Sequence, residues 1–391
     1  MAIMMSDLLR DLVEEVLIRV PLTSLRAVRL TCKKWNDVCK DGSFIKKHIV
    51  EAKKKQVMNE FEIIMMTDLK VYLMTVDLHS NVDPSMTLKG TLFSLKDDAN
   101  HHHHQVDDIV RVFYCDGLLL CITRDLNSRL VVWNPYFGET RWIQPRDRYH
   151  IFENYALGYD EKKKYKIFRF VDDSYAYREE ERICELELYS FESDSWKVVL
   201  LTVPPEWEID YHHRGVSLKG NTYWYATNKN DKNDDVVFLI CFDFTTERFG
   251  APLPLPFNPC PTWDDIVSLS SAGEDQLAVL FQNVHTLRME IWVTSKVEPT
   301  EISWNKLFLA VDMRQLIGFA FLSGTFFIDK KKNFAVVFDR DVGASYTRGI
   351  AYIIGNNGYF EKVDFGEAAN QDCYPLVSSY VPSTEQITQL T

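Results

Sequence analysis

The spacing of apolar residues changes near Lys55, and this change limits the folds that are open to the chain. Before Lys55, apolar residues recur every fourth position, as one face of a helix requires. After it, runs of aromatic and β-branched residues, which are typical of strands, are separated by turn residues. The helical stripe consists of Leu8, Leu12, Val16 and Val20, widened by Val13 and Leu17. The sequence therefore predicts a small helical head joined to a large β body.

Three helices are expected in the head. Pro21 ends the first, because proline lacks a backbone N–H and disfavours helical geometry in the residue before it. A second is capped by Thr23 or Ser24, and a third by Asp41 or Ser43. The second is expected to carry Leu25, Val28, Cys32 and Trp35 on one face, and the third to carry Phe44, Ile45 and His48.

The pattern alone leaves two interpretations of the head open. It is either a subdomain packed on its own body or a docking module whose apolar stripes a partner covers. A head of about 50 residues buries little surface by itself, which favours a partner.

The head resembles the F-box, the motif by which substrate receptors dock on the Skp-type adaptor of a cullin–RING ubiquitin ligase. The match comprises Leu8, residues 11–17, residues 19–21, Ser24-Leu25 and the Cys-Lys-Lys-Trp sequence at 32–35. It departs from the family at one point, because the usual Leu-Pro start is here Leu8-Leu9.

The resemblance implies that residues 1–50 form the adaptor-docking domain. We expect Leu8, Leu12, Leu25, Val28 and Trp35 in particular to present apolar surface to the adaptor. The full set of implied adaptor-binding residues is Leu8, Leu9, Leu12, Val13, Val16, Leu17, Val20, Pro21, Leu25, Val28, Cys32 and Trp35.

The body contains a repeated unit in which apolar strands are followed by an aromatic-rich hairpin. The hairpins start roughly 50 to 60 residues apart, near the period of kelch-like propeller blades. One sheet cannot bury both of its faces, so such units stack radially. The hairpins lie at 130–142, 187–196, 240–249 and 290–304.

The order of these motifs, with phrases such as Trp133-Asn134-Pro135, is similar to the F-box-associated domain of plant F-box proteins. That resemblance implies a propeller-like β domain of four-stranded units over residues 58–382, used for substrate capture. The strand at 376–381 has no hairpin partner, and the early strands at 61–66 and 70–78 form an incomplete blade, so we expect these pieces to pair and close the ring. Residues 383–391 are expected to be a polar tail with little to bury.

The charge and the cysteine content of the chain indicate which classes of partner and which cellular compartments to expect. Residues 1–55 hold 12 Lys and Arg against 7 Asp and Glu, so the rest of this −12 chain carries −17. An acidic body argues against nonspecific nucleic-acid binding. There is no apolar run of the roughly 20 residues that span a membrane and no signal peptide. Eight cysteines without a CxxC pair indicate reduced thiols, which predicts a location in the cytoplasm, the nucleus or both.

The sequence contains no catalytic motif, and we expect no cofactor and no metal site. Four consecutive histidines at 101–104 are better explained as a loop than as a metal site, since no ligand spacing completes one. We therefore predict a noncatalytic substrate receptor of a Skp–cullin–F-box ubiquitin ligase. The alternative is a propeller enzyme or small-ligand-binding protein with a helical extension. Target contacts are placed in loops, with Trp207, Tyr211, His212 and His213 as candidates.

Overall fold

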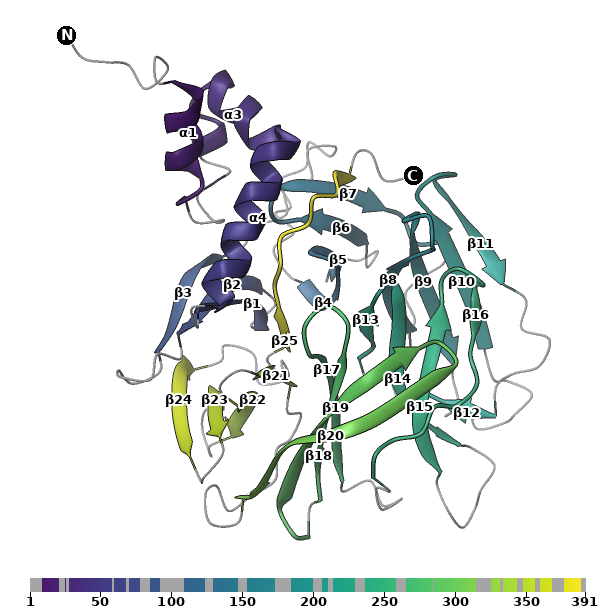
Figure 1. Ribbon diagram of the computed structural model, residues 1–391. Coiled ribbons are helices and arrows are strands. Elements are labelled where there is room, and N and C mark those ends of the chain that lie inside the picture. Colours follow the sequence, from purple (N-terminus) through teal and green to yellow (C-terminus); the bar gives the residue numbers. More distant parts are fainter. Residues whose placement is uncertain are drawn as a thin grey trace.

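The computed structural model shows a helical head set on a ring of β sheets (Figure 1). It describes residues 9–20, 25, 28–57, 60–67, 70–77, 85–91, 109–123, 129–146, 153–172, 184–199, 206–209, 214–228, 236–257, 265–283, 285–313, 325–330, 333–342, 347–355, 359–367 and 376–387. The histidine tract at 101–104 lies outside these residues.

The head contains α1 (Arg10–Leu17), α3 (Lys33–Lys40) and α4 (Gly42–Val57), with helical residues also at Leu25 and 28–29. Asp41 caps α4 as predicted, because its Oδ1 accepts hydrogen bonds from the backbone N–H of Ser43 at 2.9 Å and of Phe44 at 3.2 Å. The head core includes Val13, Leu17, Leu25, Trp35 and Phe44.

The prediction of one helix from Leu25 to Trp35 is wrong. Thr31 donates its hydroxyl to the carbonyl of Val28 at 2.6 Å, and Cys32 has extended backbone angles of −156° and 154°. Such a residue is an N-cap, so α3 starts afresh at Lys33. Cys32 and Trp35 therefore do not share a helix with Leu25 and Val28.

The described strands form six antiparallel sheets, which we number as blades 1 to 6. This confirms the predicted mainly β class of four-stranded, propeller-like units. Blade 1 consists of β25 (Leu376–Ser379), β1 (Glu60–Thr67), β2 (Lys70–Asp77) and β3 (Ser85–Thr91). Blade 2 consists of β4 (Ile109–Cys115), β5 (Leu118–Thr123), β6 (Leu130–Asn134) and β7 (Glu139–Ile143). Blade 3 consists of β8 (Glu153–Tyr159), β9 (Tyr165–Asp172), β10 (Cys184–Ser190) and β11 (Ser195–Val199).

The inner edge of blade 4 is divided between two short strands that both pair with β14. Blade 4 consists of β12 (Trp207–Glu208), β13 (Val216–Leu218), β14 (Asn221–Asn228), β15 (Val237–Asp243) and β16 (Arg248–Phe249). Blade 5 consists of β17 (Ile266–Ser271), β18 (Leu277–Gln282), β19 (Arg288–Glu298) and β20 (Glu301–Asp312). Blade 6 consists of β21 (Thr325–Asp329), β22 (Phe334–Val342), β23 (Thr347–Gly355) and β24 (Phe360–Glu367).

The innermost strands of neighbouring blades contact one another around the ring, for example β4 with β8 and β21 with β25. Both faces of the inner strand β5 are buried along its whole length, and five of its six residues are apolar. In β5, Leu119 and Cys121 pack toward the head and blade 1, whereas Leu118, Leu120 and Ile122 pack toward blade 3. Each sheet thus packs face to face against its neighbours around the ring.

The predicted ring closure is confirmed. β25 pairs with β1 in antiparallel register, so the last strand completes the blade that the early strands begin. Closure removes an open sheet edge of the kind that invites aggregation.

The prediction that the segment after Pro382 buries little is wrong for the described residues 383–387. Ser383 is 5% exposed and Ile387 is fully buried among residues of blades 2 and 3. The segment crosses Gly117, whose φ is +78°, and a Cβ there would overlap the carbonyl oxygen of Val381. We call residues 381–387 the C-terminal strap.

Candidate functional site

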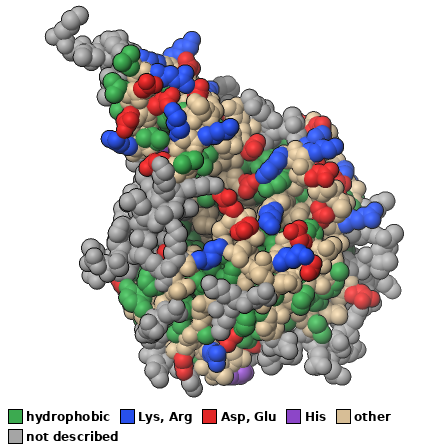
Figure 2. All heavy atoms as spheres, in the orientation of Figure 1, with side chains coloured by type: hydrophobic (Ala, Val, Ile, Leu, Met, Phe, Trp, Pro, Cys, Tyr) green, Lys and Arg blue, Asp and Glu red, His purple; other side chains and the backbone are tan. Residues whose placement is uncertain are grey.

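Five of the eight large apolar side chains that are exposed among the described residues lie on the head. In the described part of the chain, Leu9, Leu12 and Val16 of the α1 region are 74%, 52% and 44% exposed. Their spacing of three and four residues places them on one side of the helix. Figure 2 shows apolar side chains among charged ones on the head. A row of this kind is a candidate surface for contact with a partner.

The other predicted docking residues are divided by burial. Val13, Leu17, Leu25 and Trp35 are buried, whereas Val20, Val28 and Cys32 are partly exposed. Leu8 and Pro21 lie outside the described residues. The expectation that Leu25 and Trp35 present apolar surface is wrong, because both side chains pack in the head core.

Two exposed apolar residues of the head were missed, Leu30 at 80% and Val50 at 52%. Leu30 falls where the chain leaves helical geometry before α3, and Val50 lies on the outer side of α4. A periodic pattern marks residues that share a stripe, so neither residue had a signal in the sequence.

Ion pairs fix α1 against the start of α4. Glu14 accepts from Lys47 at 2.8 Å and from Arg10 at 3.1 Å, and Arg10 also pairs with Asp41 at 2.9 Å. The hydrogen bonds from Lys47 and Arg10 lower the pKa of Glu14. The bonds from Ser43, Arg10 and the backbone of Phe44 lower the pKa of Asp41. These carboxylates orient the helix that carries the exposed row.

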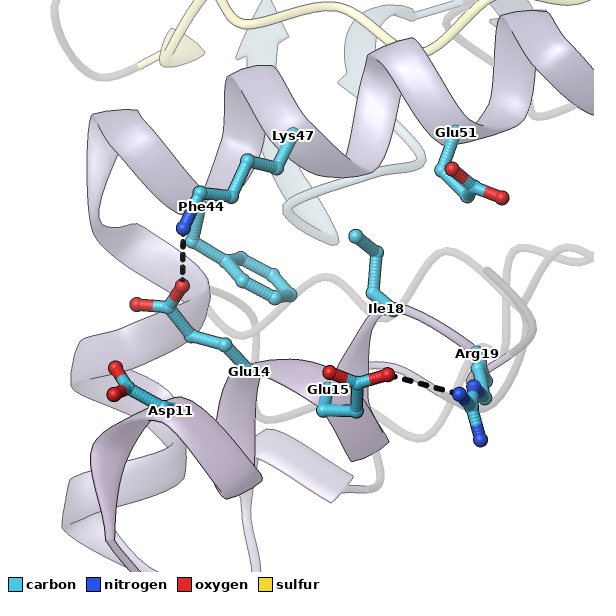
Figure 3. A pocket seen from close by; sticks show the side chains of 8 residues that line it. All are labelled: Asp11, Glu14, Glu15, Ile18, Arg19, Phe44, Lys47 and Glu51. Carbon is cyan, nitrogen blue, oxygen red and sulfur yellow. Dashed lines mark hydrogen bonds and ion pairs between the residues drawn. The ribbon is translucent and has the colours of Figure 1, made fainter.

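A hollow of about 430 Å³ lies between α1 and α4 (Figure 3). Four carboxylates and two cations line it, which differs from the mostly apolar lining of small-molecule sites. Its lining residues are Asp11, Glu14, Glu15, Ile18, Arg19, Phe44, Lys47 and Glu51.

The head contacts blade 1 through α4 and β1, and it contacts blade 2 through the β6–β7 turn of that blade. His48 Nδ1 lies 3.2 Å from the hydroxyl of Tyr136, and Arg29 donates to the carbonyl of Phe137 at 2.6 Å. Apolar contact accompanies these bonds, because Trp35 and Phe44 belong to the same core cluster as Tyr136. The exposed row on α1 is therefore held in a defined position relative to the propeller.

The body residues proposed for target contacts are only partly described. Trp207 in β12 is half-buried, with its ring centroid 4.7 Å from that of Phe249 and 6.0 Å from that of Phe170. Tyr211, His212 and His213 lie outside the described residues. Trp207 thus packs within the body, and its contact with a target stays a prediction.

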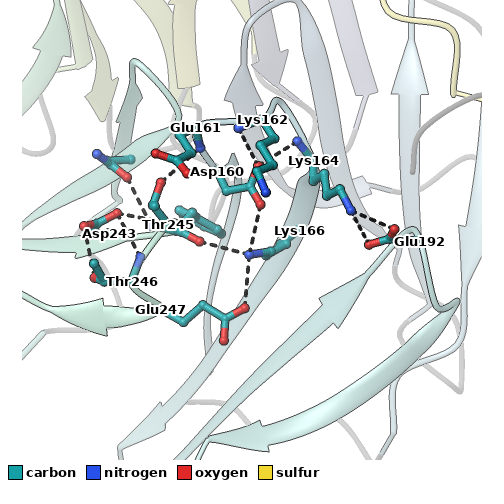
Figure 4. Close-up of polar contacts among 12 residues, drawn as sticks. Asp160, Glu161, Lys162, Lys164, Lys166, Glu192, Asp243, Thr245, Thr246 and Glu247 are labelled. Atoms are coloured by element: carbon teal, nitrogen blue, oxygen red, sulfur yellow. Dashed lines mark hydrogen bonds and ion pairs between the residues drawn. The ribbon is translucent and has the colours of Figure 1, made fainter.

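Polar contacts join neighbouring blades on the body surface (Figure 4). Lys166 of blade 3 pairs with Glu247 of blade 4 at 3.0 Å and donates to the carbonyl of Phe244 at 3.0 Å. Lys164 pairs with Glu192 at 2.7 Å within blade 3. The contacts of Lys166 therefore link blade 3 to blade 4.

The described residues contain no group of three or more His, Cys, Asp or Glu side chains placed to hold a metal ion. Among the same residues, no helix has the length and apolar character to cross a bilayer.

Both the head and the body of the chain match known protein families. An F-box domain model matches residues 5–47, and an F-box associated beta propeller domain model matches residues 62–387. The chain is 66% identical over 393 residues to F-box protein At5g42460 of Arabidopsis thaliana, covering 99% of each chain. It is 63% identical to F-box protein At2g17830 of the same organism, covering 99% of each chain. It is 52% identical to the Arabidopsis F-box/kelch-repeat protein At3g16740, covering 98% of this chain and 100% of that one.

Proposed function

Because this chain belongs to the F-box proteins that carry an F-box associated beta propeller domain, we propose that it is the substrate-recognition subunit of a Skp–cullin–F-box ubiquitin ligase. The head docks on the Skp-type adaptor, and the propeller captures a target protein. The chain performs no chemistry and needs no cofactor, because its contribution to rate is proximity between a target lysine and the charged ubiquitin.

The exposed row of Leu9, Leu12 and Val16 is the observation that carries this proposal. A monomer gains nothing by exposing three large apolar side chains on one helix while burying Val13 and Leu17 of the same helix. A partner that covers the row accounts for the exposed and the buried positions together. The row lies within residues 5–47, which match the F-box model.

The propeller suits the capture of a protein. Its loops are free of the packing demands on its strands and carry specificity. The acidic balance of residues 56–391, −17, favours a protein target over nucleic acid. We place the protein in the cytoplasm, the nucleus or both, where thiols stay reduced.

The experiment compares two matched valines. Val16 on α1 is 44% exposed and Val198 on β11 is 45% exposed, so Val16→Asp and Val198→Asp change equally accessible side chains. Covering an unpaired carboxylate at an interface costs about 3 kcal/mol, which corresponds to about a 100-fold loss of affinity. We expect Val16→Asp, and likewise Leu12→Asp, to abolish co-purification with purified Skp-type adaptor, and Val198→Asp to leave it unchanged.

Circular dichroism checks that each variant keeps the fold of the native chain. Leu25→Asp is unsuitable here, because Leu25 is buried and the change would unfold the head. Native co-purification by Val16→Asp and Leu12→Asp would overturn the docking proposal.

A further inference from the structure

Asn134, the last residue of β6, is fully buried and uses both ends of its amide. Its Oδ1 accepts from the backbone N–H of Tyr136 at 2.8 Å and of Phe137 at 3.3 Å. Its Nδ2 donates to the carbonyl of Glu385 at 2.7 Å and to that of Ser383 at 3.4 Å. One side chain therefore joins a turn of blade 2 to the C-terminal strap.

The head contacts blade 2 at the turn that Asn134 shapes, and we call this β6–β7 turn the seat of the head. Its Oδ1 fixes the backbone of Tyr136 and Phe137, the two residues that His48 and Arg29 contact. If this backbone shifts, the hydroxyl of Tyr136 and the carbonyl of Phe137 move with it. The turn is thus one of two supports of the head, beside the contact between α4 and β1.

Hydrogen bonds hold the strap on both sides of the residues that Asn134 contacts. On the N-terminal side, the N–H of Val381 donates to the hydroxyl of Tyr114 at 3.3 Å. On the C-terminal side, the N–H of Ile387 donates to Glu139 Oε2 at 3.0 Å, and the Ile387 side chain is fully buried. The strap is therefore part of the folded body, and Asn134 contacts its middle.

The β15–β16 turn of blade 4 offers a comparison with the β6–β7 turn of blade 2. Asp243 ends β15 as Asn134 ends β6, and its Oδ1 accepts from the N–H of Thr245 at 2.8 Å and of Thr246 at 3.4 Å (Figure 4). The second carboxylate oxygen of Asp243 is held within the same turn, because it accepts from the hydroxyl of Thr246 at 3.0 Å. In blade 2 the strap takes that part, since the carbonyl of Glu385 holds the amide nitrogen of Asn134. The amide nitrogen of Asn134 serves the strap, which an aspartate cannot do, because it has no donor there.

We propose that Asn134 is a positioning residue that couples the C-terminal strap to the seat of the head. Residues 383–385 of the strap thereby help to set the orientation of the adaptor-docking head relative to the propeller. The geometric part stands on the contacts above. Its consequence for ubiquitin transfer rests on the proposed function.

The experiment measures head–body distances in the full chain by single-molecule energy transfer. Donor and acceptor dyes are placed through unnatural amino acids at Lys33 of α3 and Lys219 of the β13–β14 turn, both exposed. The native chain is expected to give one narrow distance population. Asn134→Asp keeps the oxygen that shapes the turn but puts a carboxylate against two carbonyl oxygens of the strap, so its population should broaden.

Shortening the chain to end at Pro382 should broaden the population in the same way. Asn134→Asp in the shortened chain should broaden it no further, because both changes break the same contact. Asp243→Asn is the matched control and should leave the population narrow. A narrow population in both Asn134→Asp and the shortened chain, or additive broadening in the combination, overturns the coupling.

If Asn134→Asp or the shortened chain fails to fold, Glu139→Ala tests the coupling between the strap and the position of the head. It removes only the acceptor for the N–H of Ile387, from a side chain that is partly exposed. We expect it to broaden the population, and a narrow one would overturn the proposal. Adaptor binding of Asn134→Asp should equal that of the native chain, while ubiquitin transfer to the target falls. A native chain that does not bind the adaptor would refute the proposed function and leave the distance measurement to decide the coupling.

Discussion

Ile63 in β1 lies directly opposite Ser379 in β25, so the two ends of the body meet in one sheet. Val377 of the same strand is buried in a cluster with Phe338 and Ile353 of blade 6. Blade 1 therefore depends on residues from both ends of the chain, and the ring is complete only after the last strand has paired.

Ending the chain before Asp372 removes β25 and exposes the edge of β1. We expect the body to unfold or aggregate at a lower temperature than the full chain, because unpaired edges recruit other strands. Melting followed by light scattering measures this, with adaptor binding by the head as the control. An unchanged melting temperature would show that the β25–β1 pairing contributes little.

Leu25 and Leu12 should behave oppositely when each is shortened to alanine. Leu25 is fully buried in the head core, so Leu25→Ala should lower the free energy of unfolding of the head by about 2–5 kcal/mol. Leu12 is 52% exposed, so Leu12→Ala should change it by less than about 0.5 kcal/mol and weaken adaptor binding instead. Hydrogen exchange of α3 amides reports the first quantity and a binding titration the second. Equal stability losses would contradict the division between core and row.

Leu9→Pro restores the family's usual residue at the start of α1. The φ of Leu9 is −59°, which proline adopts without strain. We expect adaptor binding to be preserved or tightened, because proline stiffens the approach to the first turn and keeps an apolar side chain at this position of the exposed row. Leu9→Ala is measured beside it and should weaken binding, because it shortens a member of the row. Weaker binding by Leu9→Pro as well would show that the proline ring does not replace the contact that Leu9 makes.

The carboxylates that hold α1 on α4 give the head a pH dependence. Folding lowers the pKa of Glu14 and of Asp41. Their contribution is therefore fully present above the unfolded pKa of about 4 and is lost as pH falls through the lower folded values. Glu14→Gln should reduce exchange protection in α1 at pH 7, and the difference from the native chain should disappear in acid. A difference that persists in acid would assign the effect to packing.

The sequence predicts features that depend on periodicity or on local chemistry. The four-residue spacing marks α1, Asp41 marks the cap of α4, and the repeated hairpins mark the blades. The strand left without a partner predicts that the last strand joins the incomplete early blade, and the structure pairs it with β1. In each case the residues carry the signal themselves, because a helix face, a cap and a strand each impose a pattern on nearby positions.

Only the tertiary structure decides which members of an apolar stripe stay exposed. Leu12 and Leu25 look alike in the sequence, yet one faces outward and the other packs beside Trp35 and Phe44. Likewise, Ser383 to Ile387 read as a polar tail, and Asn134 and Glu139 give them partners that lie far away in the chain. Exposure and long-range hydrogen bonds depend on which surfaces meet when the chain closes, and no local pattern encodes that meeting.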